Sequence, residues 1–565
     1  MTSNKDEKTF KAIIFSALTV IVLSVAVCIF MLVKSENFKS AGSNQISQSP
    51  AMGEFVGYVT PSDDKIYSSE ETVTLSATAK NGAQAYAMIT GQKIPLTASS
   101  QSENGYTLLS GNVILPASQK IVQELGSVAF FVTYGGITQI CYGGKITVAA
   151  YEAEEKASEP ETYSSGGEAT ALVVTGMITE GKDVTKNELF YNPTYGNLVC
   201  GMTDYVVGRL IDFDDDGNEV EFYKLMSGRA VKADSNVRLV KADTVMNYNT
   251  VTLSASSASD GNKIIISEKM KVPYKLRYVG QNFTKGYEKL RYNAKPFTAT
   301  AIDFVFEYTV SFSGNISSFS DEIVSGVDVS VNPSDKTLIL HCRLRQPGKF
   351  YGYRMEYDEN GNLCLSFRQP VRSISDLRVI IDPGHGGNPG ALDYTGKYRE
   401  SDQTLAISKH LAAYLSSAGA SVYMTRTADN EVSLENRRLM NQQIKPDLFI
   451  SIHLNGADNR SRSGTSTYYF TPFSQPLASC INNRLVEVYT ESCYRDNPSM
   501  QKEANGGDRY YPFFVTRTDV CPSVLVETGF FTHQLESKYL IDKGYQQAFA
   551  RAIYTAVEDF VNTQK

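Results

Sequence analysis

The sequence predicts a multidomain chain with an N-terminal transmembrane helix, two or three all-β modules, and a C-terminal α/β domain with a mostly parallel, twisted sheet. Three observations carry this prediction. Residues 12–33 are almost wholly apolar and uncharged, and roughly 20 such residues span a bilayer. Residues 53–371 contain short alternating runs separated by turn residues, which is typical of β-strands. From residue 372, apolar strand patterns alternate with helical patterns, which favours a parallel sheet.

The apolar segment at 12–33 lies between Lys11 and Lys34. Signal peptides have a shorter apolar region, about 7–15 residues long. We therefore expect an uncleaved anchor, with residues 1–11 as a short cytoplasmic tail and 34–52 as a polar linker. Cleavage near 41–43 is the alternative.

The region between anchor and C-terminal domain divides by composition. About 100 residues of short strands favour an immunoglobulin-like sandwich, and the small module that follows weakly resembles SH3-like barrels. The predicted parts are a β-sandwich at 53–150, an acidic linker at 151–169, a small β module at 170–245, a β-rich module at 246–371 and the α/β domain at 372–565.

The segment 212–217 (DFDDDG) copies the first half of an EF-hand calcium loop. The twelfth position of such a loop needs a bidentate glutamate, and Tyr223 stands there. A hairpin turn between two strands is the favoured interpretation.

The C-terminal domain places four chemically active side chains at element ends. His385 follows the apolar run 379–382, Glu400 precedes a predicted helix, and His453 and Glu527 each end an apolar run. Reactive groups in open α/β sheets gather outside the carboxyl ends of the strands. The pattern therefore predicts one shared site.

Two imidazoles and one carboxylate leave the fourth tetrahedral position of zinc open to water, as in catalytic rather than structural zinc sites. We therefore predict that His385, Glu400 and His453 bind one Zn²⁺ per chain. A further carboxylate is needed to carry the water proton, and Glu527 is the candidate. Asp382 is expected to orient a ligand from behind.

At this point the sequence resembles a known family. Residues from about 376 to 565 are similar to the zinc-dependent N-acetylmuramoyl-L-alanine amidases, the type often called Amidase_3. The matching motifs, in the family's order, are IDPGHGG at 381–387, Glu400 before a helix, MTRTAD at 424–429, DLFISIHLN at 447–455 and VLVETGFF at 524–531.

The resemblance implies that His385, Glu400 and His453 hold zinc and that Glu527 is the catalytic acid/base. It also implies the reaction, which is hydrolysis of the amide between N-acetylmuramic acid and L-alanine of the stem peptide. Arg517 is a candidate contact for peptide carboxylates, with a structural ion pair as the alternative. Two other functions stay open: a wall-binding or regulatory protein with a decayed hydrolase domain, and a zinc peptidase acting on stem peptides.

The implied substrate, peptidoglycan, places the C-terminal domain outside the membrane. We therefore expect a single-pass protein of a bacterial cell membrane, anchored by its N-terminal helix and facing the wall. The net charge of −7 and the pI near 5.5, with no basic patch, exclude nucleic acid as an expected partner. Eight cysteines show no metal-type spacing, and Cys342 and Cys364 are candidates for pairing across neighbouring strands.

Overall fold

The structure is a computed structural model, and the residues it describes fall in several ranges. These are 53–117, 123–149, 169–175, 182–185, 188–213, 218–234, 236–242, 248–258, 261–281 and 296–565. The predicted membrane span at 12–33 lies outside these residues. Within these ranges, no helix has the length and apolar character needed to cross a bilayer.

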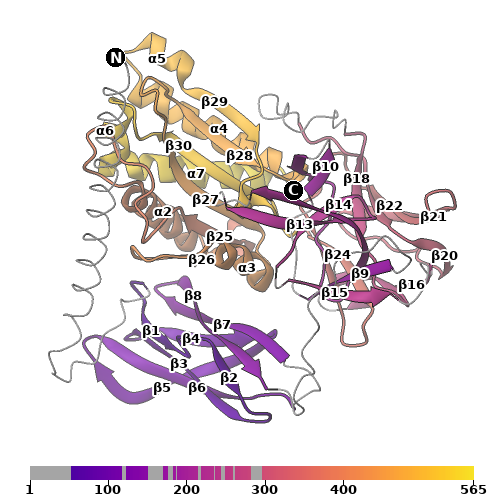
Figure 1. The fold of residues 1–565 in the computed structure, drawn as a ribbon. Coiled ribbons are helices and arrows are strands. Elements are labelled where there is room, and N and C mark those ends of the chain that lie inside the picture. The colour runs from indigo at the N-terminus through magenta and orange to yellow at the C-terminus, as the bar shows by residue number, and fades with distance from the viewer. Residues whose placement is uncertain are drawn as a thin grey trace, which may run out of the picture. The chain divides into compact units, whose positions relative to one another are not determined.

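The C-terminal α/β domain is built on a mostly parallel sheet (Figure 1). The central strands run in the order β26-β25-β27-β30 and are mutually parallel, while β28 pairs antiparallel with β30 and parallel with β29. Their bounds are β25 Arg378–Pro383, β26 Ser421–Met424, β27 Leu448–Asn455, β28 Thr465–Tyr469, β29 Asn505–Tyr510 and β30 Ser523–Phe530. The predicted α/β domain with a mostly parallel sheet is thus present.

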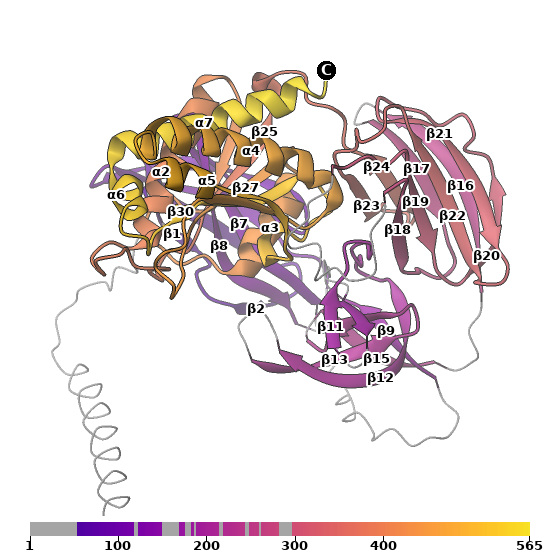
Figure 2. The same cartoon turned by 90° about the horizontal axis from the view of Figure 1, so that it is seen from above.

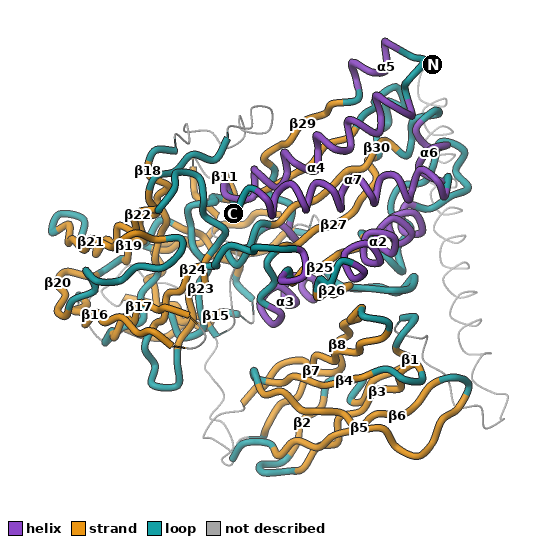
Figure 3. The backbone as a smooth tube through the Cα atoms, turned by 180° about the vertical axis from the view of Figure 1, so that it is seen from behind, coloured by secondary structure: helices purple, strands orange, loops and turns teal. Residues whose placement is uncertain are grey.

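Helices lie along these strands, as the backbone trace shows (Figure 3). Gly419, with a positive φ, follows the end of α2, and Asp542 caps α7 by accepting hydrogen bonds from the amides of Gly544 and Tyr545. The helices are α2 Glu400–Ser417, α3 Leu434–Ile444, α4 Gln475–Val488, α5 Pro498–Glu503, α6 Glu536–Ile541 and α7 Lys543–Asn562, with single turns at Ile374–Asp376, Pro472–Ser474, Tyr489–Cys493 and Phe514–Thr516.

The central strands are buried on both faces because successive side chains point to opposite sides of a sheet. Val379 and Ile381 join the core that contains apolar residues of α2, α4 and α7. Ile380 joins a second core with Met440 and Ile444 of α3. The unalternating apolar runs in the sequence are explained by this double coverage.

The N-terminal β strands enclose a core of their own. They are β1 Val56–Thr60, β2 Lys65–Tyr67, β3 Thr72–Lys80, β4 Gln84–Ile89, β5 Gln92–Glu103, β6 Tyr106–Ile114, β7 Gln123–Tyr134 and β8 Ile137–Val148. Strand β8 also pairs in parallel with β26, from Ile137 opposite Val422 to Gln139 opposite Met424. The N-terminal strands and the strands of the α/β domain therefore form one continuous sheet, a pairing that the sequence did not predict.

Two further sheet-rich regions precede the α/β domain (Figure 2). A seven-stranded sheet has the order β11-β10-β14-β13-β12-β9-β15. Its strands are β9 Ala169–Val174, β10 Lys182–Thr185, β11 Glu188–Tyr191, β12 Thr203–Phe213, β13 Glu219–Leu225, β14 Arg229–Lys232 and β15 Val237–Ala242. Phe213 pairs with Glu219 across an antiparallel ladder, so antiparallel strands flank the calcium-like segment, whose residues 214–217 lie outside the described residues.

The next region contains a five-stranded and a four-stranded sheet, in the orders β20-β16-β17-β24-β23 and β18-β19-β22-β21. The strands are β16 Asn249–Ala258, β17 Gly261–Ser267, β18 Tyr274–Val279, β19 Ala301–Phe306, β20 Thr309–Gly314, β21 Val324–Asn332, β22 Thr337–Leu344, β23 Tyr353–Tyr357 and β24 Leu363–Phe367. Cys342 on β22 and Cys364 on β24 therefore lie in different sheets. All seven cysteines within the described ranges are free thiols, so the suggested pairing of these two is absent there.

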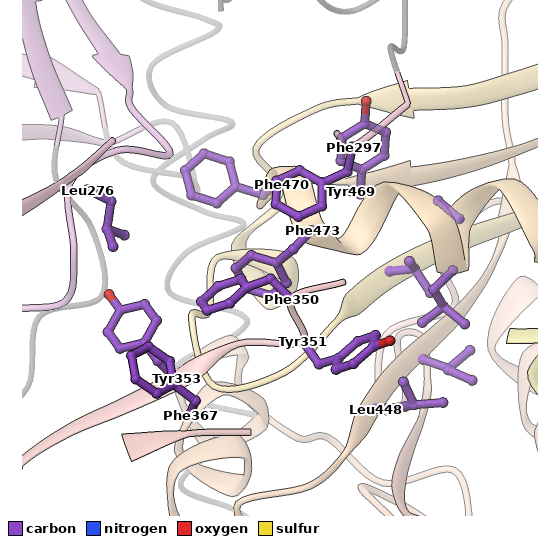
Figure 4. Packing of buried hydrophobic residues seen from close by; sticks show 14 of the residues in the cluster. Leu276, Phe297, Phe350, Tyr351, Tyr353, Phe367, Leu448, Tyr469, Phe470 and Phe473 are labelled. Atoms are coloured by element: carbon purple, nitrogen blue, oxygen red, sulfur yellow. The ribbon is translucent and has the colours of Figure 1, made fainter. Parts of the chain in front are cut away.

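Aromatic side chains join this β region to the α/β domain (Figure 4). The ring of Phe350 meets that of Phe473 edge-on, with centroids 5.3 Å apart, and Tyr351 meets Phe560 at 6.2 Å. Such pairs contribute roughly 0.5–1.5 kcal/mol beyond the area they bury. The α/β domain thus packs against the β region that precedes it in the chain.

Candidate metal centre

The four predicted site residues come from four different elements. His385 follows β25 and adopts a left-handed backbone with φ 61°. Glu400 is the first residue of α2, where the helix dipole favours a carboxylate. His453 on β27 pairs in register with Glu527 on β30, so these two side chains leave the sheet on the same face. The strands, not the local sequence alone, bring the four groups together.

The three predicted ligands converge on one point. The ligand atoms of His385, Glu400 and His453 all lie within 4.8 Å of one another. Oε1 of Glu400 is 3.0 Å from Nε2 of His385 and 3.2 Å from Nδ1 of His453. The two imidazole rings meet nearly at right angles, with their centroids 4.8 Å apart.

Backbone amides hold the Glu400 carboxylate in place. Oε1 also accepts a hydrogen bond from the amide of Leu454 at 2.9 Å, and Oε2 accepts one from Ala391 at 2.8 Å. Burial alone raises the pKa of this carboxyl, but the contacts with His385 and His453 outweigh burial and bring its pKa below the usual range. Glu400 is therefore ionised and fixed in orientation.

Glu527 has the opposite electrostatic character. Burial, and then the negative charge of Glu400, raise the pKa of Glu527 well above its usual range. Its Oε2 is buried without a hydrogen-bond partner in the described structure, although its main-chain oxygen accepts a bond from Thr465 at 2.9 Å. Unpartnered buried carboxylate oxygens are costly, so this atom is available for a proton or a bound group.

The donor set fits a zinc ion. Zinc bonds of about 2.0–2.1 Å in a tetrahedron separate neighbouring ligand atoms by about 3.3 Å, close to the 3.0 and 3.2 Å measured here. The ligand side chains are partly accessible, His385 at 28% and His453 at 19%, whereas Glu400 is at 4%. Two partly exposed imidazoles and one carboxylate match a catalytic site rather than a closed structural one.

Two glycines make room for these ligands. A Cβ atom at Gly384 would lie 2.4 Å from the His453 ring, and one at Gly390 would lie 2.6 Å from the ring of His385. Gly390 also has a positive φ of 66°, which an L side chain rarely adopts. Gly384 belongs to the IDPGHGG motif of the sequence, whereas Gly390 lies outside the motifs named above.

Two buried arginines that the sequence analysis did not single out hold the turn that carries His385. Arg426 donates to the carbonyls of Pro383 at 2.9 Å and Gly384 at 2.7 Å. Arg437 donates to the carbonyls of Pro383 and His385 and pairs with Asp382. Of these two arginines, only Arg426 lies in a motif recognised in the sequence, MTRTAD at 424–429.

Asp382 forms an ion pair with Arg437 and does not hydrogen-bond to either histidine of the candidate metal site. Its carboxylate accepts hydrogen bonds from Thr425 at 2.6 Å and Ser451 at 2.7 Å and pairs with Arg437, not with either histidine. The charge of Arg437 and the two hydroxyl groups outweigh burial and lower the pKa of Asp382. Asp382 therefore anchors the turn indirectly.

Arg517 does not reach the site. Its guanidinium lies 3.4 Å from the ring centroid of Tyr191 and donates to the carbonyl of Pro512. Only 3% of Arg517 is exposed, and it precedes β30 whereas Glu527 lies in the later part of that strand. The suggestion that Arg517 contacts peptide carboxylates is therefore wrong, because a stacked, buried guanidinium is not accessible to substrate.

The family model described as N-acetylmuramoyl-L-alanine amidase matches residues 379–559. The probable cell wall amidase LytH of Staphylococcus epidermidis is 31% identical over 209 residues, which are 36% of this chain and 65% of LytH. The chain thus spans slightly less than two thirds of that relative's length.

YqiI of Bacillus subtilis, an uncharacterized protein, is 32% identical over 196 residues, which are 34% of this chain and 88% of YqiI. The crystal structure of an N-acetylmuramoyl-L-alanine amidase from Clostridium difficile 630 is 31% identical and covers 33% of this chain and 97% of that one, with a TM-score of 0.30. Through residues 379–559, which match the family model, the chain belongs to the N-acetylmuramoyl-L-alanine amidase family.

Proposed function

We propose that this protein is a zinc-dependent peptidoglycan hydrolase. Its substrate is the amide that joins the lactyl group of N-acetylmuramic acid to L-alanine of the stem peptide. Family membership supports the reaction. The observation that carries the proposal is the Glu400 oxygen 3.0 and 3.2 Å from two histidine nitrogens.

We assign His385, Glu400 and His453 as the ligands of one Zn²⁺. When bound, the ion would polarise the scissile carbonyl and make water acidic enough to supply hydroxide near neutral pH. The amides of Leu454 and Ala391 keep Glu400 aimed at the centre. Arg426 and Arg437 hold the turn that presents the His385 ring.

Glu527 is assigned as the general base and then the general acid. It takes the proton of the attacking water and passes it to the departing amine of L-alanine. Its raised pKa supports this role, because a carboxyl with a strong hold on a proton accepts it more readily than an ordinary glutamate. The in-register pairing with His453 places it beside a ligand.

We also propose a location at the cell surface. The substrate lies outside the membrane, and the relative LytH is named a probable cell wall amidase. Residues 12–33 would provide a single-pass anchor, with peptidoglycan facing the C-terminal domain. Along the sequence, the β regions lie between this segment and the α/β domain.

The test is a product analysis with full-length protein in detergent. The zinc-loaded protein is incubated with purified peptidoglycan, and new amino termini and glycan chain lengths are measured. We expect free L-alanine amino groups and unshortened glycan. Removal of zinc with a chelator should abolish the release, and added zinc should restore it.

Two results would contradict the proposal. Cleavage further along the stem peptide would indicate a peptidase instead. An absence of any product from protein shown to hold zinc would indicate a binding or regulatory protein with an inactive hydrolase domain.

A further inference from the structure

Two loops extend outward from the metal centre and lie against each other. The first, between β25 and α2, contains Ala391, whose amide bonds the ligand Glu400 at 2.8 Å. The second follows β27, and a Cβ at its Gly456 would lie 3.3 Å from that of Ala391. The next residue, Ala457, donates to Thr532 beyond β30. The second loop thus contacts both the loop between β25 and α2 and the segment that follows β30.

The first loop is folded into a stiff hairpin. Leu392 bridges Arg399, and the Asp393 carboxylate accepts hydrogen bonds from the amides of Thr395, Lys397 and Tyr398 at 2.7–3.0 Å. Leu392 is nevertheless 45% exposed and Tyr398 47% exposed. A surface that is ordered but uncovered is suited to binding, because little entropy is lost when a ligand arrives.

Arg460 of the second loop packs on this hairpin. Its guanidinium lies 5.4 Å from the ring centroid of Tyr394 and donates to the Tyr394 carbonyl at 3.3 Å. These contacts fix the direction of an otherwise exposed side chain. No carboxylate lies within 4 Å of its guanidinium among the described residues. By contrast, Arg399 of the hairpin pairs with both Asp402 and Asp429.

The distance from the metal centre suits a stem peptide. Tyr394 is three residues beyond Ala391, a reach of at most about 11 Å, because an extended chain advances about 3.3–3.6 Å per residue. A peptide leaving the scissile amide covers the same distance in two or three residues. A carboxylate at that position would meet the oriented guanidinium of Arg460, which offers a planar pair of donors.

We infer that Arg460 is a specificity-determining residue that binds the free carboxylate of the second residue of the stem peptide. This inference rests on the proposed amidase function and names the chemical group recognised beside the site. Arg460 contributes to substrate binding and takes no part in proton transfer. Its loss should therefore weaken binding without slowing the chemical step.

The test uses two synthetic muramoyl peptides that differ only in whether the second residue carries a free carboxylate or its amide. Full-length wild type, Arg460→Met and the matched control Arg462→Met, an exposed arginine of the same loop, are compared by steady-state kinetics. We expect Arg460→Met to raise KM about tenfold for the free acid, with kcat unchanged. Its KM for the amide should equal that of wild type.

The outcomes separate this inference from the proposed function. If Arg460→Met affects both peptides equally, or if Arg462→Met has the same effect, carboxylate recognition by Arg460 is overturned and the amidase assignment stands. If wild type holds zinc and releases L-alanine termini from neither peptide, the amidase assignment fails and the inference falls with it. Unchanged kinetics of Arg460→Met on the amide also show that the variant is folded.

Discussion

Two polar clusters include a residue of strand β30 or of the segment just before it. They differ in whether a buried carboxyl oxygen is left without a hydrogen-bond partner. The first is the candidate metal centre, with Glu527 in the later part of the strand. The second surrounds Asp519, four residues before the strand begins. Both contain a buried carboxyl with a raised pKa, Glu527 in one and Asp519 in the other.

The Asp519 cluster is closed on itself. The carboxylate accepts hydrogen bonds from the hydroxyl of Tyr353 at 2.7 Å and the amide of Asn197 at 3.2 Å, and the hydroxyl of Tyr274 lies 3.0 Å from that of Tyr353. Asp519, Tyr353 and Tyr274 are all buried. The chain of bonds joins the α/β domain to the β regions that precede it.

The comparison shows that a raised pKa does not by itself mark a catalytic group. Burial raises both pKa values, but Asp519 has partners inside the protein, whereas Oε2 of Glu527 has none in the described structure. Only the metal centre also has partly exposed ligands beside the carboxyl. Unsatisfied and accessible groups therefore distinguish a site for chemistry from a structural junction.

The largest effect is expected for Glu527→Gln, which keeps the size of the side chain but cannot carry a proton. General acid–base catalysis contributes about 10²–10⁴-fold, so kcat should fall about 10³-fold on purified peptidoglycan. Zinc content, measured by metal analysis, should stay near one per chain. The paired variant His453→Ala should lose the metal; a His453→Ala protein that retains zinc would contradict the ligand assignment.

The next effect concerns pH and stability at Asp519. Burial raises its pKa from 3.8 to about 6. Between these pH values Asp519 is ionised in the unfolded chain but still protonated in the folded chain. The free energy of unfolding therefore falls as pH rises from about 4 to 6. The loss is roughly 3 kcal/mol.

Asp519→Asn cannot ionise and should lack this part of the pH dependence. Urea unfolding of both proteins at several pH values checks this, followed by circular dichroism because the chain has no tryptophan. Parallel pH profiles for wild type and variant would show that Asp519 titrates normally. Zinc binding and kcat at a pH where both are folded should be unchanged.

A smaller effect is expected for Arg426→Lys. A lysine offers one donor nitrogen where Arg426 uses two, Nε to the Pro383 carbonyl and Nη2 to the Gly384 carbonyl, so the turn that presents His385 should loosen. Loss of such supporting contacts typically weakens metal binding about 10–100-fold. Competition with a zinc chelator measures the affinity, and Arg438→Lys serves as control because Arg438 pairs with Glu435 instead. Equal zinc affinity in Arg426→Lys and wild type would refute the supporting role.

The smallest effect is expected for Tyr274→Phe. This change removes one hydrogen bond at the far end of the Asp519 cluster, which costs about 1 kcal/mol of unfolding free energy. Zinc affinity and kcat should be unaffected. A clear loss of activity in folded protein would mean that the two clusters are coupled.

The sequence predicted the site better than its surroundings. His385, Glu400 and His453 could be grouped because apolar runs mark the strands, and because the carboxyl ends of parallel strands meet at one edge of a sheet. The antiparallel pairing of β12 with β13 was also predictable, since a missing twelfth ligand argued against the calcium loop and favoured a hairpin. These signals are local in the chain.

What could not be predicted depends on contacts between distant residues. Strand β8 pairs with β26 although Ile137 and Val422 are far apart in the sequence, and neither strand carries a local mark of its partner. The burial of Arg517 against Tyr191 is of the same kind. The roles of Arg426 and Arg437 depend on main-chain carbonyls, which every sequence offers equally.

The most direct test of the central claim is the anomalous scattering of crystals of the zinc-loaded protein at the zinc absorption edge. We expect one peak per chain, about 2.0–2.2 Å from the ring nitrogens of His385 and His453 and from a carboxylate oxygen of Glu400. A peak at another place, or one that Glu400 does not contact, would contradict the assignment of this centre as the catalytic zinc site.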